Sequence, residues 1–241
     1  MLSKKQFKLI NSLKKKKYRS EYQLFLAEGI KVVEEFINSD FKPHLIVCTS
    51  DYSDELSINN LLEISDNDLT RISEFSTPNQ ILGVFNIPIM QRPKTSGLSL
   101  LLDGVNDPGN MGTIIRLCDW FGLEQIICSL NTVDCYNPKV VQASMGSLSR
   151  IAVVYTNIAS YLKQETRSIY GALLNGENVY HKKLNKESVL VLGNESNGIS
   201  EEIQKLITAK ITIPQFGEKK RTESLNVATA TAILLSEFMR E

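Results

Sequence analysis

From residue 98 onward, the chain repeats one pattern that strongly limits its fold: a short apolar run followed by a helix-like segment. The apolar runs are continuous rather than alternating, which is typical of strands buried on both faces. We expect strands at 98–102, 125–128, 151–155, 169–174, 189–192 and 209–213. We expect helices at 110–121, 138–146, 158–164, after a cap at Ser200, and at 225–240. This alternation predicts a mostly parallel sheet with helices on both faces.

The first part of the chain predicts a separate, small α/β domain. We expect helices at 3–16, 28–39 and 66–75, and strands at 23–27, 44–48, 61–64 and 81–85. Pro88, Pro93 and Gly97 stand among polar residues, as is typical of a linker. We therefore predict two domains, residues 1–92 and 93–241.

Composition narrows the class of protein. A chain of 241 residues with 42% hydrophobic and 22% charged residues is ordinary for a globular protein with a sizeable core. No apolar run approaches the ~20 residues of a membrane-spanning helix, and the lysine-rich start lacks the apolar segment of a signal peptide. We therefore expect a cytoplasmic protein with no membrane association.

Cysteine and histidine are too sparse to suggest a metal site. Cys48, Cys118, Cys128 and Cys135 show no C-x-x-C spacing, so reduced core thiols are expected rather than disulfides or zinc ligands. The chain has only two histidines. We expect neither a metal nor histidine-based catalysis.

Positive charge is concentrated at the start of the chain, although the net charge is zero. The residues that precede the first acidic residue, Glu21, include Lys4, Lys5, Lys8, Lys14, Lys15, Lys16, Lys17 and Arg19. Such an arm suits contact with phosphate groups, for which Lys14, Lys15, Lys16, Lys17 and Arg19 are the candidates. A solvated helix face gives the same pattern, so charge alone leaves both interpretations open.

A glycine-rich stretch follows the strand expected at 98–102. The spacing of Gly104, Gly109 and Gly112 matches neither the dinucleotide fingerprint nor the P-loop, which argues against those two kinds of phosphate site.

The same stretch leads into a helix that carries a basic side chain. We expect Asn110 to cap a helix beginning at Met111, which places Arg116 near the positive end of the helix dipole. A cation there is unfavourable unless it binds an anionic ligand. A surface arginine paired to a carboxylate explains Arg116 equally well.

Two further segments place polar side chains at a strand end and a helix start. Gly193 and Gly198 flank Glu195, which we expect either to orient a substrate group or Arg116, or to steady the turn through an ion pair. Ser224 is a natural N-cap for the last helix. Alternatively, Ser224, Asn226 and the free N–H groups of that helix start converge on a small ligand.

Together these segments resemble the three signature motifs of the SpoU/TrmH-type RNA ribose 2′-O-methyltransferases in the SPOUT superfamily. The motifs are N-D-P-G-N-M-G-T-I-I-R from Asn106, L-G-N-E-S-N-G from Leu192, and I-P-Q-F-G from Ile213 with S-L-N-V-A from Ser224. The resemblance covers about residues 98–241. F-L-A-E-G-I-K-V-V-E-E from Phe25 is also similar to the start of the small substrate-binding domain that many members carry.

The resemblance implies properties that the pattern of strands and helices does not show. It implies a C-terminal domain with a trefoil knot, which binds S-adenosylmethionine and works as a homodimer, whereas the pattern alone predicts a simple doubly wound sheet. By resemblance, the cofactor-binding positions are Leu174, Gly176, Gly193, Asn194, Ile213, Pro214 and Leu225. The catalytic positions are Asn110, Arg116, Glu195, Ser224 and Asn226.

The implied reaction transfers the sulfonium methyl group to a ribose 2′-hydroxyl of RNA. Proposals for the family give Arg116 the role of general base. A guanidinium normally stays protonated in a protein, so clamping the adjacent phosphate is the physically easier role.

The chain departs from the family pattern after Pro214. Gln215 stands where methionine is usual, and the following loop is longer than in compact members and rich in Lys219, Lys220 and Arg221. This loop is either an additional RNA contact or a solvated segment.

Two other functions remain open. One is an inactive RNA-binding or ribosome-assembly factor with the same fold, and the other is a base-modifying enzyme of the superfamily. The complete set of predicted catalytic residues argues for activity. Ribosomal RNA is favoured over transfer RNA, because a separate basic domain suits a folded, extended target.

Overall fold

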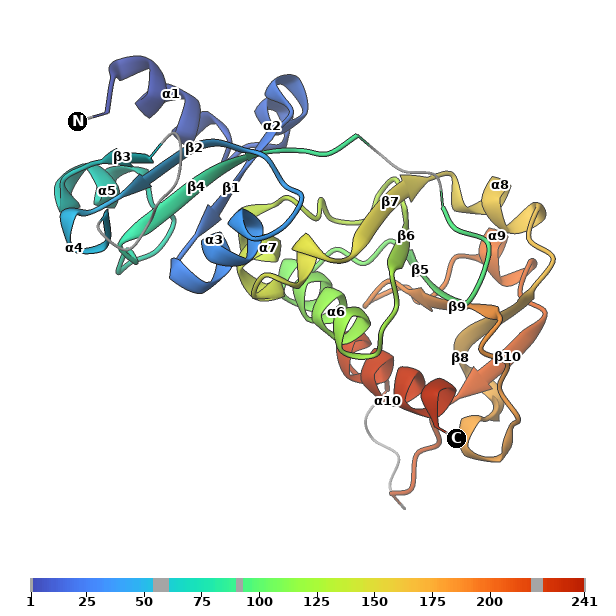
Figure 1. Ribbon diagram of the computed structural model, residues 1–241. Coiled ribbons are helices and arrows are strands. Elements are labelled where there is room, and N and C mark those ends of the chain that lie inside the picture. Colours follow the sequence, from blue (N-terminus) through green and yellow to red (C-terminus); the bar gives the residue numbers. More distant parts are fainter. Residues whose placement is uncertain (1, 54–60, 90–92, 218–222, 241) are drawn as a thin grey trace. The chain divides into compact units, whose positions relative to one another are not determined.

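A computed structural model describes residues 2–53, 61–89, 93–217 and 223–240. The chain forms two compact units, the first from residues 1–89 and 134–150 and the second from residues 90–133 and 151–241 (Figure 1). The predicted boundary at residue 92 stays a prediction. The grouping of 134–150 with the first unit is an additional feature, for which the sequence pattern gave no signal.

The first unit is built on a four-stranded sheet with the order β1-β4-β2-β3. β4 (Ile81–Asn86) pairs antiparallel with both β1 (Leu24–Glu28) and β2 (Pro43–Cys48). β3 (Leu61–Glu63) pairs parallel with β2. These strands confirm the predicted small α/β domain.

Alternating side chains of this sheet build two apolar layers. On one face, Leu24 and Leu26 join a buried cluster with residues of α1 (Lys4–Ser12) and α5 (Asp66–Ile72). On the other face, Phe25 packs against Phe36 of α3 (Ile30–Ile37), with ring centroids 5.1 Å apart. Both faces are therefore covered, and the short helix α4 (Ser50–Ser53) follows β2.

The helix predicted over 3–16 is shorter in the structure, and a second helix that was not predicted follows it. α1 ends at Ser12, and α2 (Lys16–Tyr22) begins after a short connection. Gln23 ends α2 with a left-handed backbone, φ 53°. The sequence pattern gave no signal for this break.

Arg19 of α2 has a structural role, which corrects its prediction as an RNA contact. The side chain of Arg19 is 3% exposed and its Nη2 lies 2.6 Å from a carboxylate oxygen of Asp134. Its Nη1 donates hydrogen bonds to the carbonyl oxygens of Leu13 and Lys14. This pairing, and the Phe25–Tyr136 ring contact, hold the segment with α7 (Pro138–Ser144) and η1 (Ser147–Ser149) within the first unit.

The second unit contains the predicted parallel sheet. All six strands of the order β10-β8-β9-β5-β6-β7 run parallel. They are β5 (Leu98–Asp103), β6 (Gln125–Ser129), β7 (Ala152–Thr156), β8 (Ser168–Asn178), β9 (Ser188–Gly193) and β10 (Ala209–Thr212). Each of the six predicted strands is present, which confirms the α/β class.

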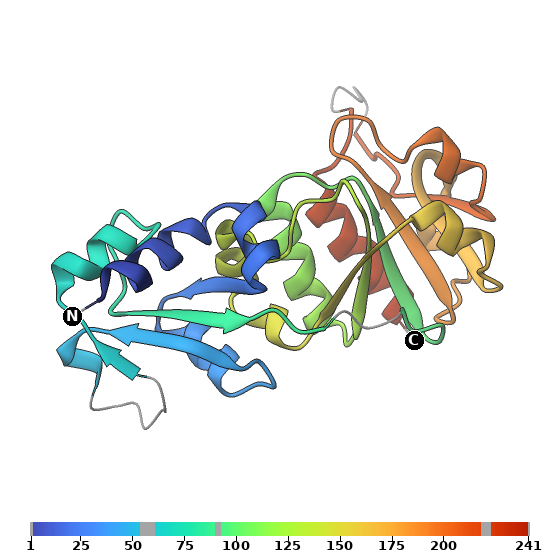
Figure 2. The same cartoon turned by 90° about the horizontal axis from the view of Figure 1, so that it is seen from above.

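Helices cover both faces of this sheet, as predicted. α8 (Ile158–Lys163) and α9 (Glu201–Gln204) share a buried cluster with Leu101, Ile127, Val189 and Val191. α6 (Pro108–Trp120) and α10 (Val227–Met239) pack side by side on the other face (Figures 1 and 2). The short helix η2 (Val179–His181) follows β8.

The strand order creates a switch point between β5 and β9. From β5 the chain proceeds outward through β6 to β7, and then returns to the other side of β5 to form β8, β9 and β10. At such a point, the loops that follow the two neighbouring strands run in opposite directions. A crevice that can bind a ligand therefore forms between these loops, at the carboxyl ends of the strands. The β5–α6 and β9–α9 loops, which carry two of the three motifs, begin at this position.

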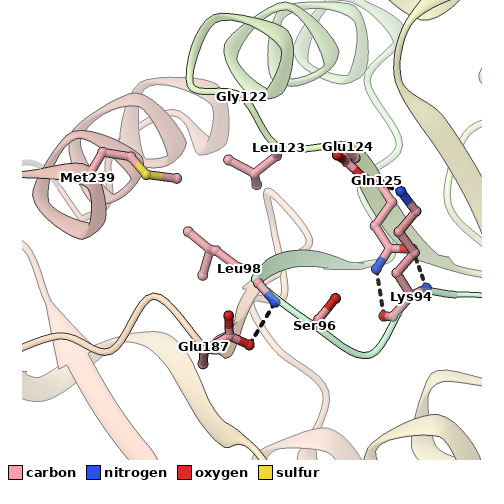
Figure 3. Close-up of a pocket in the computed structure, with 10 residues that line it drawn as sticks. Lys94, Ser96, Leu98, Gly122, Leu123, Glu124, Gln125, Glu187 and Met239 are labelled. Atoms are coloured by element: carbon pink, nitrogen blue, oxygen red, sulfur yellow. Dashed lines mark hydrogen bonds and ion pairs between the residues drawn. The ribbon is translucent and has the colours of Figure 1, made fainter.

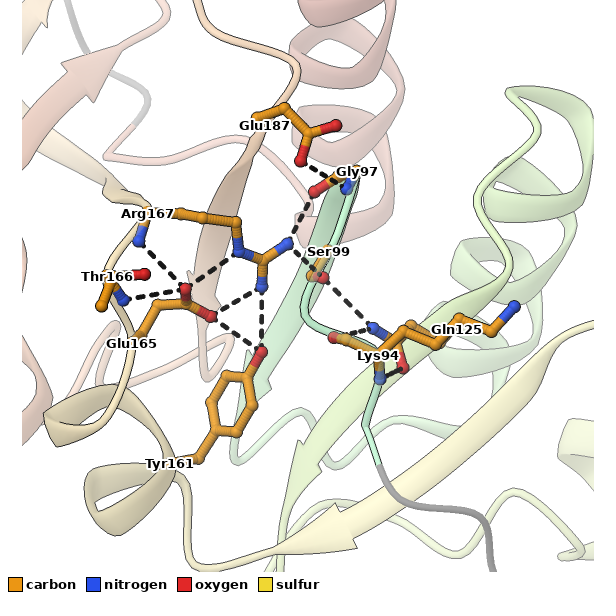
Figure 4. Close-up of polar contacts among 9 residues, drawn as sticks. All are labelled: Lys94, Gly97, Ser99, Gln125, Tyr161, Glu165, Thr166, Arg167 and Glu187. Carbon is orange, nitrogen blue, oxygen red and sulfur yellow. Dashed lines mark hydrogen bonds and ion pairs between the residues drawn. The ribbon is translucent and has the colours of Figure 1, made fainter.

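The opposite, amino edge of the sheet is held by a buried polar cluster (Figure 4). The Arg167 guanidinium pairs with Glu165 at 2.6 Å, and these side chains are only 9% and 4% exposed. Arg167 also donates to the carbonyl oxygen of Gly97 and to the hydroxyl groups of Ser99 and Tyr161. The hydrogen bond from Arg167 lowers the pKa of Glu165 to about 2. The cluster thus fixes the start of β5 against the segment before β8.

A cavity lies at this same amino edge (Figure 3). Its lining includes Leu98 and Gln125, where β5 and β6 begin, together with Glu187 and Met239. None of the predicted catalytic or cofactor-binding residues lines this cavity. It is therefore separate from the switch point at the carboxyl edge.

All four cysteines are buried and none forms a disulfide, which agrees with reduced core thiols. Within the described ranges, no group of three or more His, Cys, Asp or Glu side chains is arranged to hold a metal ion. In the same ranges, no helix is both long and apolar enough to cross a lipid bilayer.

Candidate active site

Helix α6 begins three residues earlier than predicted, and Asp107 rather than Asn110 is its N-cap. The Asp107 carboxylate accepts a hydrogen bond of 2.7 Å from the Asn110 N–H, and Pro108 occupies the first helical position. The Asp-Pro pair was the sequence signal for this start. Asn110 is therefore the third residue of α6, and its side chain is available for other contacts.

The earlier start also changes the interpretation of Arg116. Arg116 is the ninth of thirteen residues in α6. The helix dipole acts mainly within the first turn, and Arg116 lies beyond that turn. The dipole argument for an anionic ligand is therefore wrong. Arg116 is exposed to solvent, and it makes no ion pair within the described part of the chain. An exposed guanidinium without a partner carboxylate is free to bind an external anion.

A tight turn presents Glu195 at the end of β9. Asn194 and Gly198 exchange backbone hydrogen bonds of 3.0 and 2.9 Å across the turn. The Asn194 side-chain oxygen accepts hydrogen bonds from the N–H groups of Ser196 and Asn197. Gly198 has φ +67°, a conformation that strains other residues. The sequence L-G-N-E-S-N-G thus folds into a closed loop with Glu195 near its tip.

Glu195 links the second motif to the first. Its carboxylate accepts hydrogen bonds from the backbone N–H groups of Asn106 and Asp107, each at 3.3 Å. It also accepts a hydrogen bond of 3.0 Å from the Asn110 side-chain amide. Asn194 contributes a further tie, because its amide donates to the Gly104 carbonyl oxygen at 2.7 Å. The β5–α6 and β9–α9 loops are therefore joined at the switch point.

The third motif joins the same network through Asn226. The Asn226 side-chain amide donates a hydrogen bond of 2.8 Å to the Asn110 side-chain oxygen. The Asn226 side-chain oxygen accepts from the N–H groups of Ala228 and Thr229, which makes Asn226 the N-cap of α10. A continuous chain Glu195–Asn110–Asn226 thus connects residues of three distant segments.

The network keeps Glu195 ionised. Burial is the largest influence and raises the pKa of Glu195. Hydrogen bonds from the Asn110 side chain and from the backbone N–H groups of Glu195, Asn106 and Asp107 outweigh it, so the pKa lies below its ordinary value. A carboxylate stabilised in this way is a poor proton acceptor. In the structure, the Glu195 carboxylate holds Asn106, Asp107 and Asn110 through these hydrogen bonds.

Ser224 lies outside this network. It is exposed and precedes α10 by three residues, so its prediction as the N-cap is wrong. The reason is that Asn226 closes the helix start instead. Across the described ranges, neither the Ser224 nor the Arg116 side chain forms a hydrogen bond with Asn110, Glu195 or Asn226.

Six of the seven positions predicted to bind the cofactor lie at the carboxyl ends of β9, β8 and β10, which are neighbours in the sheet. β8 leaves β9 after Gly171, and its register with β10 then shifts, so that residues 172–176 protrude from the ladder. Leu174 and Gly176 lie in this protrusion. Gly193 and Asn194 end β9, Ile213 and Pro214 follow β10, and Leu225 precedes α10.

These residues fit a ligand with apolar parts. Leu174 is 74% exposed and Leu225 is 48% exposed, although apolar side chains of this size usually lose solvent contact. Gly176 and Gly193 bring backbone together, because a Cβ at either position would overlap the backbone of a neighbouring segment. Exposed apolar walls and bare backbone groups suit an adenine ring and a methionine tail. The charged loop with Lys219, Lys220 and Arg221 lies outside the described residues.

Substitution of Gly193 by alanine should disrupt this edge. The added Cβ would overlap the backbone of Gly198 and Ile199, which cannot move without opening the Asn194–Gly198 turn. We expect the free energy of unfolding to fall by about 1–3 kcal/mol, and S-adenosylmethionine binding to weaken as well. Urea denaturation and calorimetric titration measure the two effects. Gly217→Ala is the matched control for stability, since a Cβ there meets no atom of the described residues within 4 Å; equal stability of the two variants contradicts the prediction.

Comparison with known proteins agrees with this arrangement. Residues 97–236 match the model of the SpoU rRNA Methylase family. The chain belongs to this family. Residues 4–83 match the MRM3-like substrate binding domain. The resemblance found in the sequence is therefore confirmed for both parts of the chain.

The relatives include enzymes that act on ribosomal RNA. The 23S rRNA (guanosine(2553)-2′-O)-methyltransferase RlmP of Bacillus subtilis is 35% identical over 231 residues, 91% of this chain and 90% of the relative. A TrmH-family protein from Porphyromonas gingivalis has a TM-score of 0.91 and 40% identity, and the match covers 99% and 98% of the two chains. An AdoMet-bound rRNA methyltransferase from Sinorhizobium meliloti has a TM-score of 0.87 and 29% identity, covering 99% and 96%.

Proposed function

We propose that this protein transfers the methyl group of S-adenosylmethionine to a ribose 2′-hydroxyl of ribosomal RNA. The observation that carries the proposal is the hydrogen-bonded chain Glu195–Asn110–Asn226, which assembles three distant motifs at the switch point of the parallel sheet. Membership of the SpoU rRNA methylase family and the RlmP relative support the reaction and the class of substrate.

Some residues of the site position other side chains, and others bind the RNA substrate. When bound, S-adenosylmethionine supplies a methyl group on a cationic sulfur. The protein must then align the hydroxyl with that methyl group, and alignment supplies much of the rate of such a transfer. Arg116 clamps the phosphate next to the target ribose, because a guanidinium stays protonated and matches phosphate geometry. Glu195 and Asn226 orient Asn110, and Ser224 contacts the ribose.

The cofactor positions extend the proposal to the β8–β10 edge. Leu174, Gly176, Gly193, Asn194, Ile213, Pro214 and Leu225 form the wall of the S-adenosylmethionine site. A trefoil knot in this region is part of the proposal and rests on the family resemblance. We further propose that the protein acts in the cytoplasm as a homodimer through its C-terminal domain, which rests on the family resemblance.

Incubation with labelled S-adenosylmethionine and ribosomal RNA from cells that lack this protein tests the function. We expect label to enter the RNA and to remain on an alkali-resistant 2′-O-methyl nucleotide. Label on a base points instead to a base-modifying enzyme, and label in transfer RNA alone overturns the choice of substrate. Absence of cofactor binding, with RNA binding retained, favours an inactive assembly factor.

A further inference from the structure

Helix α2 carries a surface that the methyl-transfer site does not explain. It consists of the N-cap residue Lys15 and of Lys16, Lys17, Tyr18 and Tyr22 of the helix, and we name it the α2 face. The three lysines are exposed, and Tyr22 is 44% exposed. The Tyr18 and Tyr22 rings stack with centroids 6.0 Å apart and planes inclined by 16°. The Lys17 ammonium lies 5.8 Å from the centre of the Tyr18 ring.

The buried side chain of Arg19 anchors the α2 face. Arg19 lies on the same helix but points into the unit, where it pairs with Asp134. The same guanidinium donates to the carbonyl oxygens of Leu13 and Lys14, just before the exposed lysines. One buried side chain therefore fixes both α2 and the connection from α1. Rigid anchoring of this kind lowers the entropy lost when a ligand binds.

The chemistry of the α2 face favours RNA over a protein partner. Three exposed ammonium groups from consecutive residues suit contacts with phosphates, and each such contact adds salt-dependent affinity. An exposed, ordered aromatic ring beside them offers a flat surface on which an unpaired base stacks. Glu21 is the one acidic residue of α2, so the face keeps a positive balance.

We propose that the α2 face binds an unpaired nucleotide of the RNA substrate, with Tyr22 stacked on its base and the three lysines on the flanking phosphates. The inference rests on the proposed function, because it names the part of the RNA that the first unit recognises. Lys14 is not part of the face, since its ammonium pairs with Glu74 at 2.9 Å.

Binding of two RNA probes to the full-length protein tests this proposal without S-adenosylmethionine. The probes are a hairpin with an unpaired loop and the same sequence annealed to its complement. We expect Tyr22→Ala to weaken hairpin binding roughly 5- to 150-fold, the range that removal of one stacked aromatic side chain produces, and to change duplex binding less than twofold. Tyr22→Phe should retain hairpin affinity because it keeps the ring.

Two controls separate the effect from general damage. Ile89→Ala removes another exposed apolar side chain of the first unit, 94% exposed, and should leave both affinities unchanged. Replacement of Lys15, Lys16 and Lys17 by alanine should weaken the binding of both probes and reduce the dependence of affinity on salt concentration. Equal loss on both probes for Tyr22→Ala, no loss on either, or loss in Tyr22→Phe overturns the proposal. Methyl transfer to ribosomal RNA, measured separately, tests the proposed function whatever the outcome here.

Discussion

Replacement of Arg116 by alanine is expected to lower the rate of methyl transfer about 100- to 1000-fold, the loss typical of removing one preorganised charged donor from an active site. Arg116 is exposed on α6, two turns beyond Asn110, and it makes no ion pair among the described residues. Its loss should therefore leave the fold intact. S-adenosylmethionine affinity should change less than twofold, because the predicted cofactor positions lie on other segments.

The comparison of Arg116→Ala with Arg116→Lys identifies the role of the guanidinium. Lysine keeps the charge but not the planar pair of donors, so a phosphate clamp predicts partial recovery. Single-turnover transfer at saturating RNA measures the chemical step, and calorimetric titration measures cofactor binding. A transfer rate of Arg116→Ala within tenfold of the original protein removes Arg116 from the catalytic group.

Replacement of Arg167 by methionine should produce the largest loss of stability, about 3–5 kcal/mol, because it leaves the Glu165 carboxylate buried and unpaired. The double variant Glu165→Leu with Arg167→Met removes both charges and should recover most of that loss. Arg240→Ala is the matched control, since the Arg240 side chain is 61% exposed and exposed pairs contribute little. Urea denaturation at pH 7 measures all three. A loss below 1 kcal/mol for Arg167→Met contradicts the prediction.

The same ion pair predicts a dependence of stability on pH. The pKa of Glu165 falls from an ordinary 4.5 to about 2 in the folded protein, chiefly through the hydrogen bond from Arg167. As the pH falls, Glu165 therefore becomes protonated at a higher pH in the unfolded chain than in the folded protein. The contribution, on the order of 3 kcal/mol, is complete above pH 4.5 and is lost between pH 4.5 and about 2. This dependence should be absent from the double variant.

The fold of the second unit followed closely from local patterns. Largely apolar runs such as 98–102 and 189–192 became β5 and β9, because a strand buried on both faces favours apolar residues at nearly every position. The exception in these runs is Ser99, whose hydroxyl accepts hydrogen bonds from Gln125 and Arg167. Helix boundaries were less accurate. Asp107 and Asn226, rather than Asn110 and Ser224, cap α6 and α10, since several neighbouring residues were able to cap and only the folded backbone selects one.

The candidate site was predictable in part. The resemblance named Asn110, Glu195 and Asn226, which the structure joins by hydrogen bonds. Arg116 and Ser224 stay predictions, as do the cofactor-binding positions. The backbone N–H groups of Asn106 and Asp107, which hold Glu195, were missed. Every residue carries an N–H group, so no side-chain pattern marks those that will face a carboxylate.

The amino-acid order alone determined the βα alternation, the parallel class of the sheet and the residues available for chemistry, because these depend on hydrophobicity and side-chain type within a few neighbours. The tertiary structure decided which residues of the same type are available to bind a ligand and which stabilise the fold. Lys16 and Arg19 look alike in a basic run, yet one is exposed and the other is buried against Asp134, 115 residues away. Burial and long-range pairing depend on the whole packed chain, and local sequence does not contain them.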